Sequence, residues 1–178
     1  MARWIKHMIK GAIMFVPSYV AFTDIFYAVR TVDGVSMQPT LNAEGNNTDF
    51  VLLNRWAASS MQFERGEVVS LVSPKDPSQW LIKRVVALEG DRLKFGYFNE
   101  SVDIPKGHCW VEGDNRQCSM DSNNFGPVSL GLITAKASRV LWPPRRWGRL
   151  EKQEPDHDRL TPCEQVERGK MFFGWELE

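Results

Sequence analysis

The feature that most constrains the fold is a series of six short β-prone runs between residues 50 and 142. They are rich in β-branched and aromatic residues and are separated by Gly, Pro, Asn and Asp. The runs are 50–56, 67–72, 80–88, 91–95, 108–113 and 132–142. No long segment with the period of a helix lies between them, so the pattern predicts a mainly β domain with antiparallel pairing, as a sandwich or a partly open barrel. Glu89-Gly90-Asp91 predicts a tight turn between the third and fourth runs.

The N-terminal region has a different pattern, typical of a membrane anchor. Residues 1–10 contain three basic residues and no acid, whereas residues 11–29 contain a single charge, Asp24. A helix of that length spans about 28 Å, close to the ~30 Å hydrocarbon core of a bilayer. The sequence therefore predicts one transmembrane helix within residues 1–30, with its basic flank on the side of insertion and the body across the membrane. A cleaved signal peptide, an amphipathic presequence and a buried core helix are the alternatives.

The composition changes again after Trp142. Two prolines end the last β-prone run, and residues 145–170 contain thirteen charged side chains of both signs. We therefore expect a β-rich domain at 31–142 and a charged, flexible tail at 143–178.

Charge and cysteine content exclude several classes of protein. The chain has 22 basic and 22 acidic side chains, a net charge of +0. A general nucleic-acid binder needs a basic surplus instead. The three cysteines, Cys109, Cys118 and Cys163, form no CxxC pair, so neither a disulfide framework nor a thiolate zinc site is indicated. No HExxH motif, P-loop or dinucleotide fingerprint is present, so the sequence implies no metal or cofactor.

A histidine-based active site is poorly supported. His7 and His157 lie in the leader and the tail, and His108 lies in a β-prone run without a GxSxG motif. A lysine can replace histidine as the base, because burial penalises the ammonium form and lowers the pKa. Lys83 lies in the most apolar run, whose two faces are both mostly apolar. On local sequence, Lys83 and Arg84 are also explained as strand-end charges that reach water.

Ser36 is the hydroxyl best placed to be a nucleophile. It lies in GVSMQPT, a glycine-containing turn that ends at Pro39, seven residues after the apolar segment. That position brings a hydroxyl close to the predicted membrane surface. On local sequence alone, an ordinary turn serine is the simpler interpretation.

Four segments follow the predicted anchor in a set order. They are GVSMQPTL (34–41), RGEVVSL (65–71), KRVVALEGD (83–91) and EGDNRQCSMDSNNFGPVS (112–129). Together they resemble the boxes of the type I signal peptidase family, membrane-bound Ser/Lys proteases that remove leader and sorting peptides. The WPPRRW ending, the short body and the form DSNNFGPVSLG are most similar to mitochondrial inner membrane peptidases of the subunit 2 type. The resemblance covers residues 12–142.

The resemblance implies a fold and a set of site residues. The fold is a signal-peptidase-like antiparallel catalytic domain behind one N-terminal transmembrane helix. Ser36 is implied to be the nucleophile and Lys83 the general base, with the Ser119 hydroxyl orienting Lys83. Asp121 matches an acidic residue that braces the site in the family, and we expect it to pair with Arg84.

The oxyanion hole departs from the family pattern. The Ser36 backbone N–H is the donor that the resemblance implies. Bacterial relatives add a side-chain hydroxyl at the position of Gly34, so here a backbone N–H or a water would have to substitute. Asp114, Gly113 and Gly126 are expected to form turns and loops rather than to take part in the chemistry.

The resemblance also implies a function, a location and partners. The chain would be a serine endopeptidase that removes signal or sorting peptides from proteins delivered to the mitochondrial intermembrane space. It would cross the inner membrane once, face that space and assemble with a sister peptidase subunit. Its precursor substrates would bind as added strands, with small residues before the cut. A bacterial or plastid leader peptidase, a non-catalytic scaffold subunit and a soluble self-cleaving regulator are the alternatives.

Overall fold

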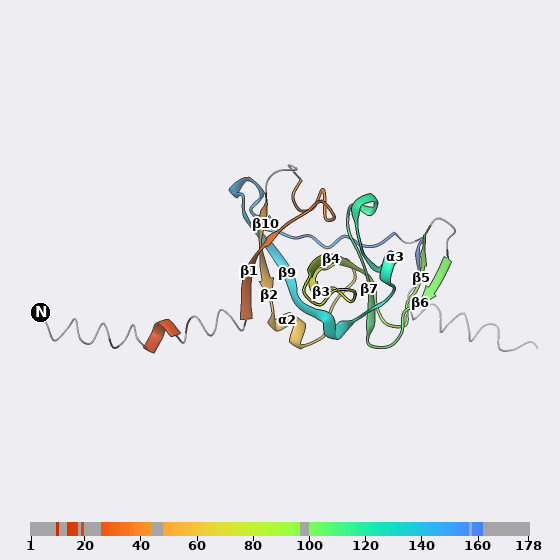
Figure 1. The fold of residues 1–178 in the computed structure, drawn as a ribbon, viewed down its shortest axis with the longest axis horizontal. Helices are drawn as coiled ribbons and strands as arrows, with labels where there is room; N and C mark the ends of the chain where they lie inside the picture. Colours follow the sequence, from red (N-terminus) through yellow and green to blue (C-terminus); the bar gives the residue numbers. More distant parts are fainter. Residues whose placement is uncertain are drawn as a thin grey trace, which may run out of the picture.

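The computed structural model describes residues 10, 14–17, 19, 26–43, 48–96, 100–156 and 158–161 (Figure 1). The strands are β1 (Tyr27–Val32), β2 (Asp49–Asn54), β3 (Val68–Val72), β4 (Trp80–Ala87), β5 (Arg92–Phe95), β6 (Glu100–Asp103), β7 (His108–Glu112), β8 (Val128–Ser129), β9 (Ile133–Trp142), β10 (Gly148–Arg149) and β11 (Leu160–Thr161). Two short α-helices, α2 (Trp56–Ser59) and α3 (Ser122–Phe125), and 3-10 helices at Arg116–Cys118, Leu130–Leu132 and Pro144–Arg146 complete the described elements. The six predicted runs are confirmed as β2, β3, β4, β5, β7 and β9, each within two residues at either end.

The main sheet is antiparallel and strongly curved. Its strand order is β1-β2-β9-β3-β4-β7-β8, and β10 adds to β9. β5, β6 and β11 form a separate antiparallel sheet, which Figure 1 shows at the opposite end of the domain from β1 and β2. The predicted mainly β, antiparallel architecture is therefore confirmed.

Strand β4 carries the most important burial pattern for the site. Its residues from Lys83 to Ala87 are buried on both faces, as the doubly apolar sequence predicted. The two charges within it are included, since Lys83 is 3% exposed and Arg84 is 5% exposed. The alternative that these side chains reach water at a strand end is therefore wrong.

Strand β1 begins inside the apolar segment that the sequence analysis gave to the anchor. Tyr27 and Val29 favour an extended backbone, and they pair with Asn54 and Leu52 of β2. Most of the predicted anchor, residues 1–30, lies outside the described residues. In the part of the chain that the structure describes, no helix is long and apolar enough to cross a membrane.

The first part of the predicted tail is packed on the domain. Gly148–Arg149 pair with β9 and Leu160–Thr161 pair with β5, and the chain between them crosses the body (Figure 1). Its charges form ion pairs with the domain, such as that between Arg159 and Glu112 at 2.7 Å. The prediction of a flexible, solvated tail is thus corrected for residues 143–156 and 158–161. The mixed charges of this segment predicted a solvated chain, but Arg146, Lys152 and Arg159 form ion pairs with acidic residues of the domain.

Candidate active site

The loop that carries Ser36 is fixed by buried apolar residues on either side of its turn. Met37 is 2% exposed and Leu41 is fully buried in the core beneath β2 and β9. The Leu41 N–H donates to the Met37 carbonyl at 2.8 Å. Gly34 adopts a φ of +93°, a conformation that residues with a Cβ rarely adopt. The loop therefore has a defined path that leaves the Ser36 side chain partly exposed.

Lys83 meets Ser36 across the fold. The two residues are 47 positions apart in sequence, and Lys83 Nζ lies 2.7 Å from Ser36 Oγ in a hydrogen bond. Burial lowers the pKa of Lys83, and the negative charges of Asp121 and Asp114 partly oppose that shift. A neutral lysine at this position can accept the serine proton, which is the chemistry that a Ser/Lys dyad needs.

Ser119 and Ser36 both border Gly113. A Cβ on Gly113 would clash with the Ser36 carbonyl oxygen and with the Ser119 side chain, whose Cβ would lie 2.8 Å away. Ser119 Oγ is buried and has no hydrogen-bond partner among the described residues. The structure thus brings Ser119 to the site without a hydrogen bond to Lys83, and its expected role in orienting Lys83 stays a prediction. The absence of a side chain at Gly113 allows Ser36 and Ser119 to approach it closely. The sequence predicted only that Gly113 forms part of a turn.

Arg84 pairs with Asp114, so the predicted pair of Arg84 with Asp121 is wrong. Arg84 Nε donates to Asp114 Oδ1 at 2.8 Å and Nη2 donates to Oδ2 at 2.7 Å. Consecutive residues of a strand point to opposite faces, so Arg84 points away from the face where Lys83 meets Ser36. Asp114, expected only to shape a turn, lies on that opposite face. The guanidinium also donates to the Gly66 carbonyl at 2.6 Å.

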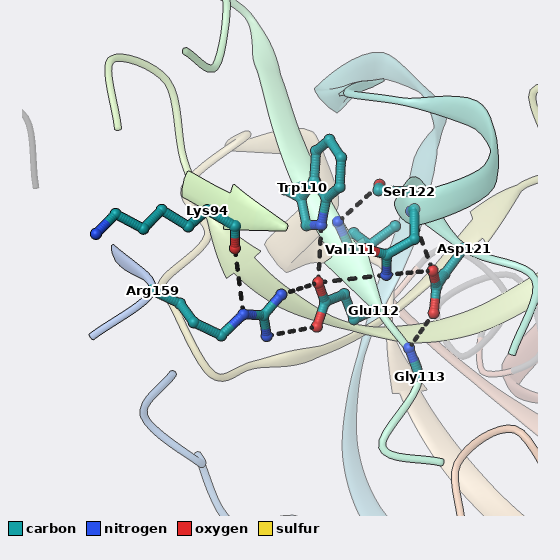
Figure 2. Close-up of polar contacts among 9 residues, drawn as sticks. Lys94, Trp110, Val111, Glu112, Gly113, Asp121, Ser122 and Arg159 are labelled. Carbon is teal, nitrogen blue, oxygen red and sulfur yellow. Dashed lines mark hydrogen bonds and ion pairs between the residues drawn. The ribbon is translucent and has the colours of Figure 1, made fainter. Parts of the chain in front are cut away.

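Asp121 instead organises the loop between β7 and α3. It caps α3 by accepting from the Asn123 N–H at 3.1 Å, and it accepts from the Gly113 N–H at 3.0 Å (Figure 2). Gly113 is the residue that borders both serines. Asp121 therefore braces the site through backbone donors.

A buried polar cluster that the sequence analysis did not predict lies beside this loop (Figure 2). Glu112 accepts from Trp110 Nε1 at 3.0 Å and from both terminal nitrogens of Arg159, at 2.7 and 3.1 Å. Arg159 Nε also donates to the Lys94 carbonyl at 3.2 Å. The C-terminal segment is thereby fastened to the residue just before Gly113. In the sequence, Glu112 stands out as the acidic residue that begins the fourth box, but nothing there indicates that Arg159 is its partner.

A cleft of about 310 Å³ leads to Ser36 and Lys83. Its lining includes residues 30–33, from β1 and the turn after it, and residues 80–83 of β4. β7 pairs with β4 only from Arg84 onward in the described register, so residues 80–83 keep an edge toward the cleft. An extended peptide can add to such an edge as a strand.

Comparisons with known proteins show which family this chain resembles. A family model described as signal peptidase, peptidase S26, matches residues 1–96 and 93–142. The mitochondrial inner membrane protease subunit 2 of mouse is 52% identical over 155 residues, covering 86% of this chain and 89% of the mouse protein. The subunit 2 protein of Saccharomyces cerevisiae is 40% identical over 142 residues, covering 77% of this chain and 80% of the yeast protein. A crystal structure of a signal peptidase I from Enterococcus faecalis matches with a TM-score of 0.38 and 19% identity, over 42% of this chain and 96% of that chain.

The resemblance predicted from the four boxes, including the similarity to subunit 2 proteins, is confirmed by the family model and by these relatives. The family model spans all four boxes together with the N-terminal region. The chain belongs to the signal peptidase family, peptidase S26.

Proposed function

We propose that this chain is a serine endopeptidase in which Ser36 is the nucleophile and Lys83 is the general base. One observation carries the proposal: Lys83 Nζ lies 2.7 Å from Ser36 Oγ in a chain of the signal peptidase family. The lysine is buried at a cleft, and its burial lowers its pKa. A base needs both the contact and the lowered pKa to work near neutral pH.

The reaction follows from this pair. Neutral Lys83 accepts the Ser36 hydroxyl proton as the oxygen attacks the scissile carbonyl carbon, and the ammonium then donates that proton to the leaving amine. Lys83 then takes a proton from a water that attacks the acyl carbon, and it returns this proton to Ser36 Oγ as the ester bond breaks and the acid product leaves. The Ser36 N–H is one oxyanion donor. Gly34 offers no side-chain hydroxyl, so a backbone N–H or a water supplies the second.

Three further residues act on the dyad. Ser119 orients Lys83 through its hydroxyl. This role is supported by the position of Ser119 Oγ, which is buried beside Gly113 and forms no hydrogen bond with another described residue. Asp121 and Arg84 are positioning residues. The first holds the loop that carries Ser119, and the second ties the strand of Lys83 to Asp114 at the other end of that loop.

Location and partners come from the relatives. The vertebrate relatives named mitochondrial inner membrane protease subunit 2 are about half identical to this chain. By this similarity, the chain acts at the mitochondrial inner membrane, anchored once through the segment that precedes β1, with its catalytic domain in the intermembrane space. Its substrates are precursors with signal or sorting peptides, which bind in the cleft as extended segments. A sister peptidase subunit completes the complex.

The test uses the purified full chain in nanodiscs, alone and with the sister subunit, and a panel of leader-bearing precursors. Ser36→Ala and Lys83→Met are compared with wild type. Ser101→Ala and Lys75→Met are matched controls at exposed positions outside the cleft. We expect both controls to cleave normally, and we expect Lys83→Met to lose about 10²- to 10⁴-fold in rate.

Two outcomes contradict the proposal. If cleavage requires the sister subunit and Ser36→Ala makes no difference, the chain is a non-catalytic scaffold subunit. If Lys83→Met keeps its rate while Ser36→Ala is inactive, another group is the base. Circular dichroism of each variant checks that loss of activity is not loss of fold.

A further inference from the structure

Asn42 closes the loop that carries Ser36. Its side-chain amide donates to the carbonyl oxygens of Val32 at 2.7 Å and of Gly34 at 3.0 Å. Asn42 is 5% exposed and has a φ of +54°, in the left-handed region that asparagine adopts more readily than most residues. One buried amide therefore fixes two carbonyl groups at the start of the nucleophile loop.

Asp49, the first residue of β2, holds Asn42 in turn. The Asn42 N–H donates to Asp49 Oδ2 at 2.8 Å, and the Asp49 N–H donates to Asn42 Oδ1 at 2.9 Å. Asp49 is fully buried, and its other carboxylate oxygen has no hydrogen-bond partner among the described residues. A buried carboxylate in this situation depends on a cation for its stability.

Arg146 supplies that cation from a distant part of the sequence. It ends the 3-10 helix Pro144–Arg146 and lies 97 positions after Asp49. Its Nη1 donates to Asp49 Oδ2, and its Nη2 donates to the Thr40 carbonyl at 2.6 Å. Within the described residues, Asp49 forms no other ion pair. The planar guanidinium thus joins the end of the nucleophile loop to the start of β2, which a single ammonium group cannot do as well.

We propose that Arg146 is a positioning residue for the nucleophile, a role that rests on the proposed function of Ser36. Its contacts reach the loop on both sides of the serine: through Asp49 and the asparagine amide to Gly34, and directly to Thr40. Arg146 does not line the cleft. It therefore acts on the geometry of the loop and not through direct contact with substrate. Without the guanidinium, the serine hydroxyl is held less well in line with the base.

The experiment compares wild type with Arg146→Met and Arg146→Lys, as full chains in nanodiscs with the sister subunit. Arg145→Met is the matched control, because Arg145 is the preceding residue, is exposed and makes none of these contacts. We expect kcat of Arg146→Met to fall by about 10- to 100-fold, the loss typical of a misplaced reacting group, with a smaller effect on KM. Arg146→Lys keeps the charge without the fork, so it should recover part of kcat.

Amide hydrogen exchange supplies a second measurement that does not depend on cleavage. Arg146→Met should exchange faster than wild type in residues 33–42, while β3 and β4 keep their protection. A kcat within about twofold of wild type overturns the proposal. So does faster exchange spread equally over β3 and β4, because that pattern means general destabilisation.

Two contingencies keep the test decisive. If Arg146→Met does not fold, Arg146→Lys is judged by the same two measurements. If wild type cleaves no precursor, the proposed function fails, and the exchange of residues 33–42 still decides whether Arg146 orders the loop.

Discussion

Arg84 and Asp114 form a two-pronged ion pair directly behind the Ser36–Lys83 contact, with both side chains less than a tenth exposed. Arg84 follows Lys83 on β4, and Asp114 follows Gly113 at the start of the loop that carries Ser119. The pair therefore joins the strand that carries Lys83 to the loop that carries Ser119. Two segments of the candidate site that are far apart in sequence are thus held together by a contact that involves neither Ser36 nor Ser119.

Breaking this pair should be costly. Asp114→Asn leaves a buried guanidinium without its counter-charge, and removing one member of a buried pair typically costs about 3–5 kcal/mol. We expect Asp114→Asn and Arg84→Gln each to lower the free energy of unfolding by that order. The double variant should lose clearly less than the sum. Urea unfolding of the four proteins in a double-mutant cycle gives the coupling energy.

The same cycle with Asp121 in place of Asp114 is the control. Asp121 accepts from backbone N–H groups and makes no contact with Arg84 among the described residues. Asp121→Asn and Arg84→Gln should therefore be nearly additive. Equal coupling energies in the two cycles would contradict the assignment of Asp114, and not Asp121, as the partner of Arg84.

The strands could be predicted because their signal is local. The run that became β4 is apolar on both faces, and that pattern alone anticipated a strand buried on both sides. β1 was missed for the opposite reason. Tyr27 and Val29 continue an apolar run that suits a membrane helix as well as a strand, and pairing with β2 decides between the two. Hydrophobicity did not indicate burial in β1 either, since Tyr27 is 45% exposed and Val29 is 52% exposed.

The site could be predicted only in part, for the same physical reason. Ser36 and Lys83 were named from a resemblance, since nothing local brings residues 47 positions apart together. The partner of Arg84 could not be read from sequence, because two aspartates follow in the same box and strand alternation selects the one on the correct face. Arg146 and Arg159 looked like charges of a solvated tail. Their buried acidic partners become apparent only when the chain is folded.

Gly113 should tolerate no side chain. A Cβ there would clash with the Ser36 carbonyl oxygen and with Ser119, so Gly113→Ala must move one side of the site. We expect kcat to fall by about 10- to 100-fold, because small displacements of reacting groups cost that much. Gly131→Ala is the matched control, since its nearest neighbour would be Ser129 Oγ at an ordinary 3.6 Å. Precursor cleavage by both variants is the measurement, and equal rates would contradict the tight packing around Gly113.

The pH dependence of cleavage should respond to Asp121. Its negative charge raises the pKa of Lys83, against the larger effect of burial, so removing the charge lowers that pKa further. In the proposed mechanism the neutral lysine is the active form, so the acid limb of kcat/KM in Asp121→Asn should move to lower pH. Glu100→Gln, at an exposed position of β6, should leave the limb in place. A shift of the Asp121→Asn limb to higher pH would contradict the assignment of Lys83 as the base.

The free energy of unfolding of the domain should also depend on pH, because Lys83 is buried. The pKa of Lys83 is lower in the folded state than its ordinary value of 10.5, so between those two values the unfolded chain binds more protons and stability rises with pH. Below the folded pKa, wild type bears the full cost of a buried ammonium, which Lys83→Met removes. Lys83→Met should therefore be more stable than wild type at low pH, and its advantage should shrink as pH approaches 10.5. Urea unfolding of both proteins at a series of pH values measures the difference, and an advantage that stays constant with pH would mean that Lys83 titrates alike in the folded and unfolded chain.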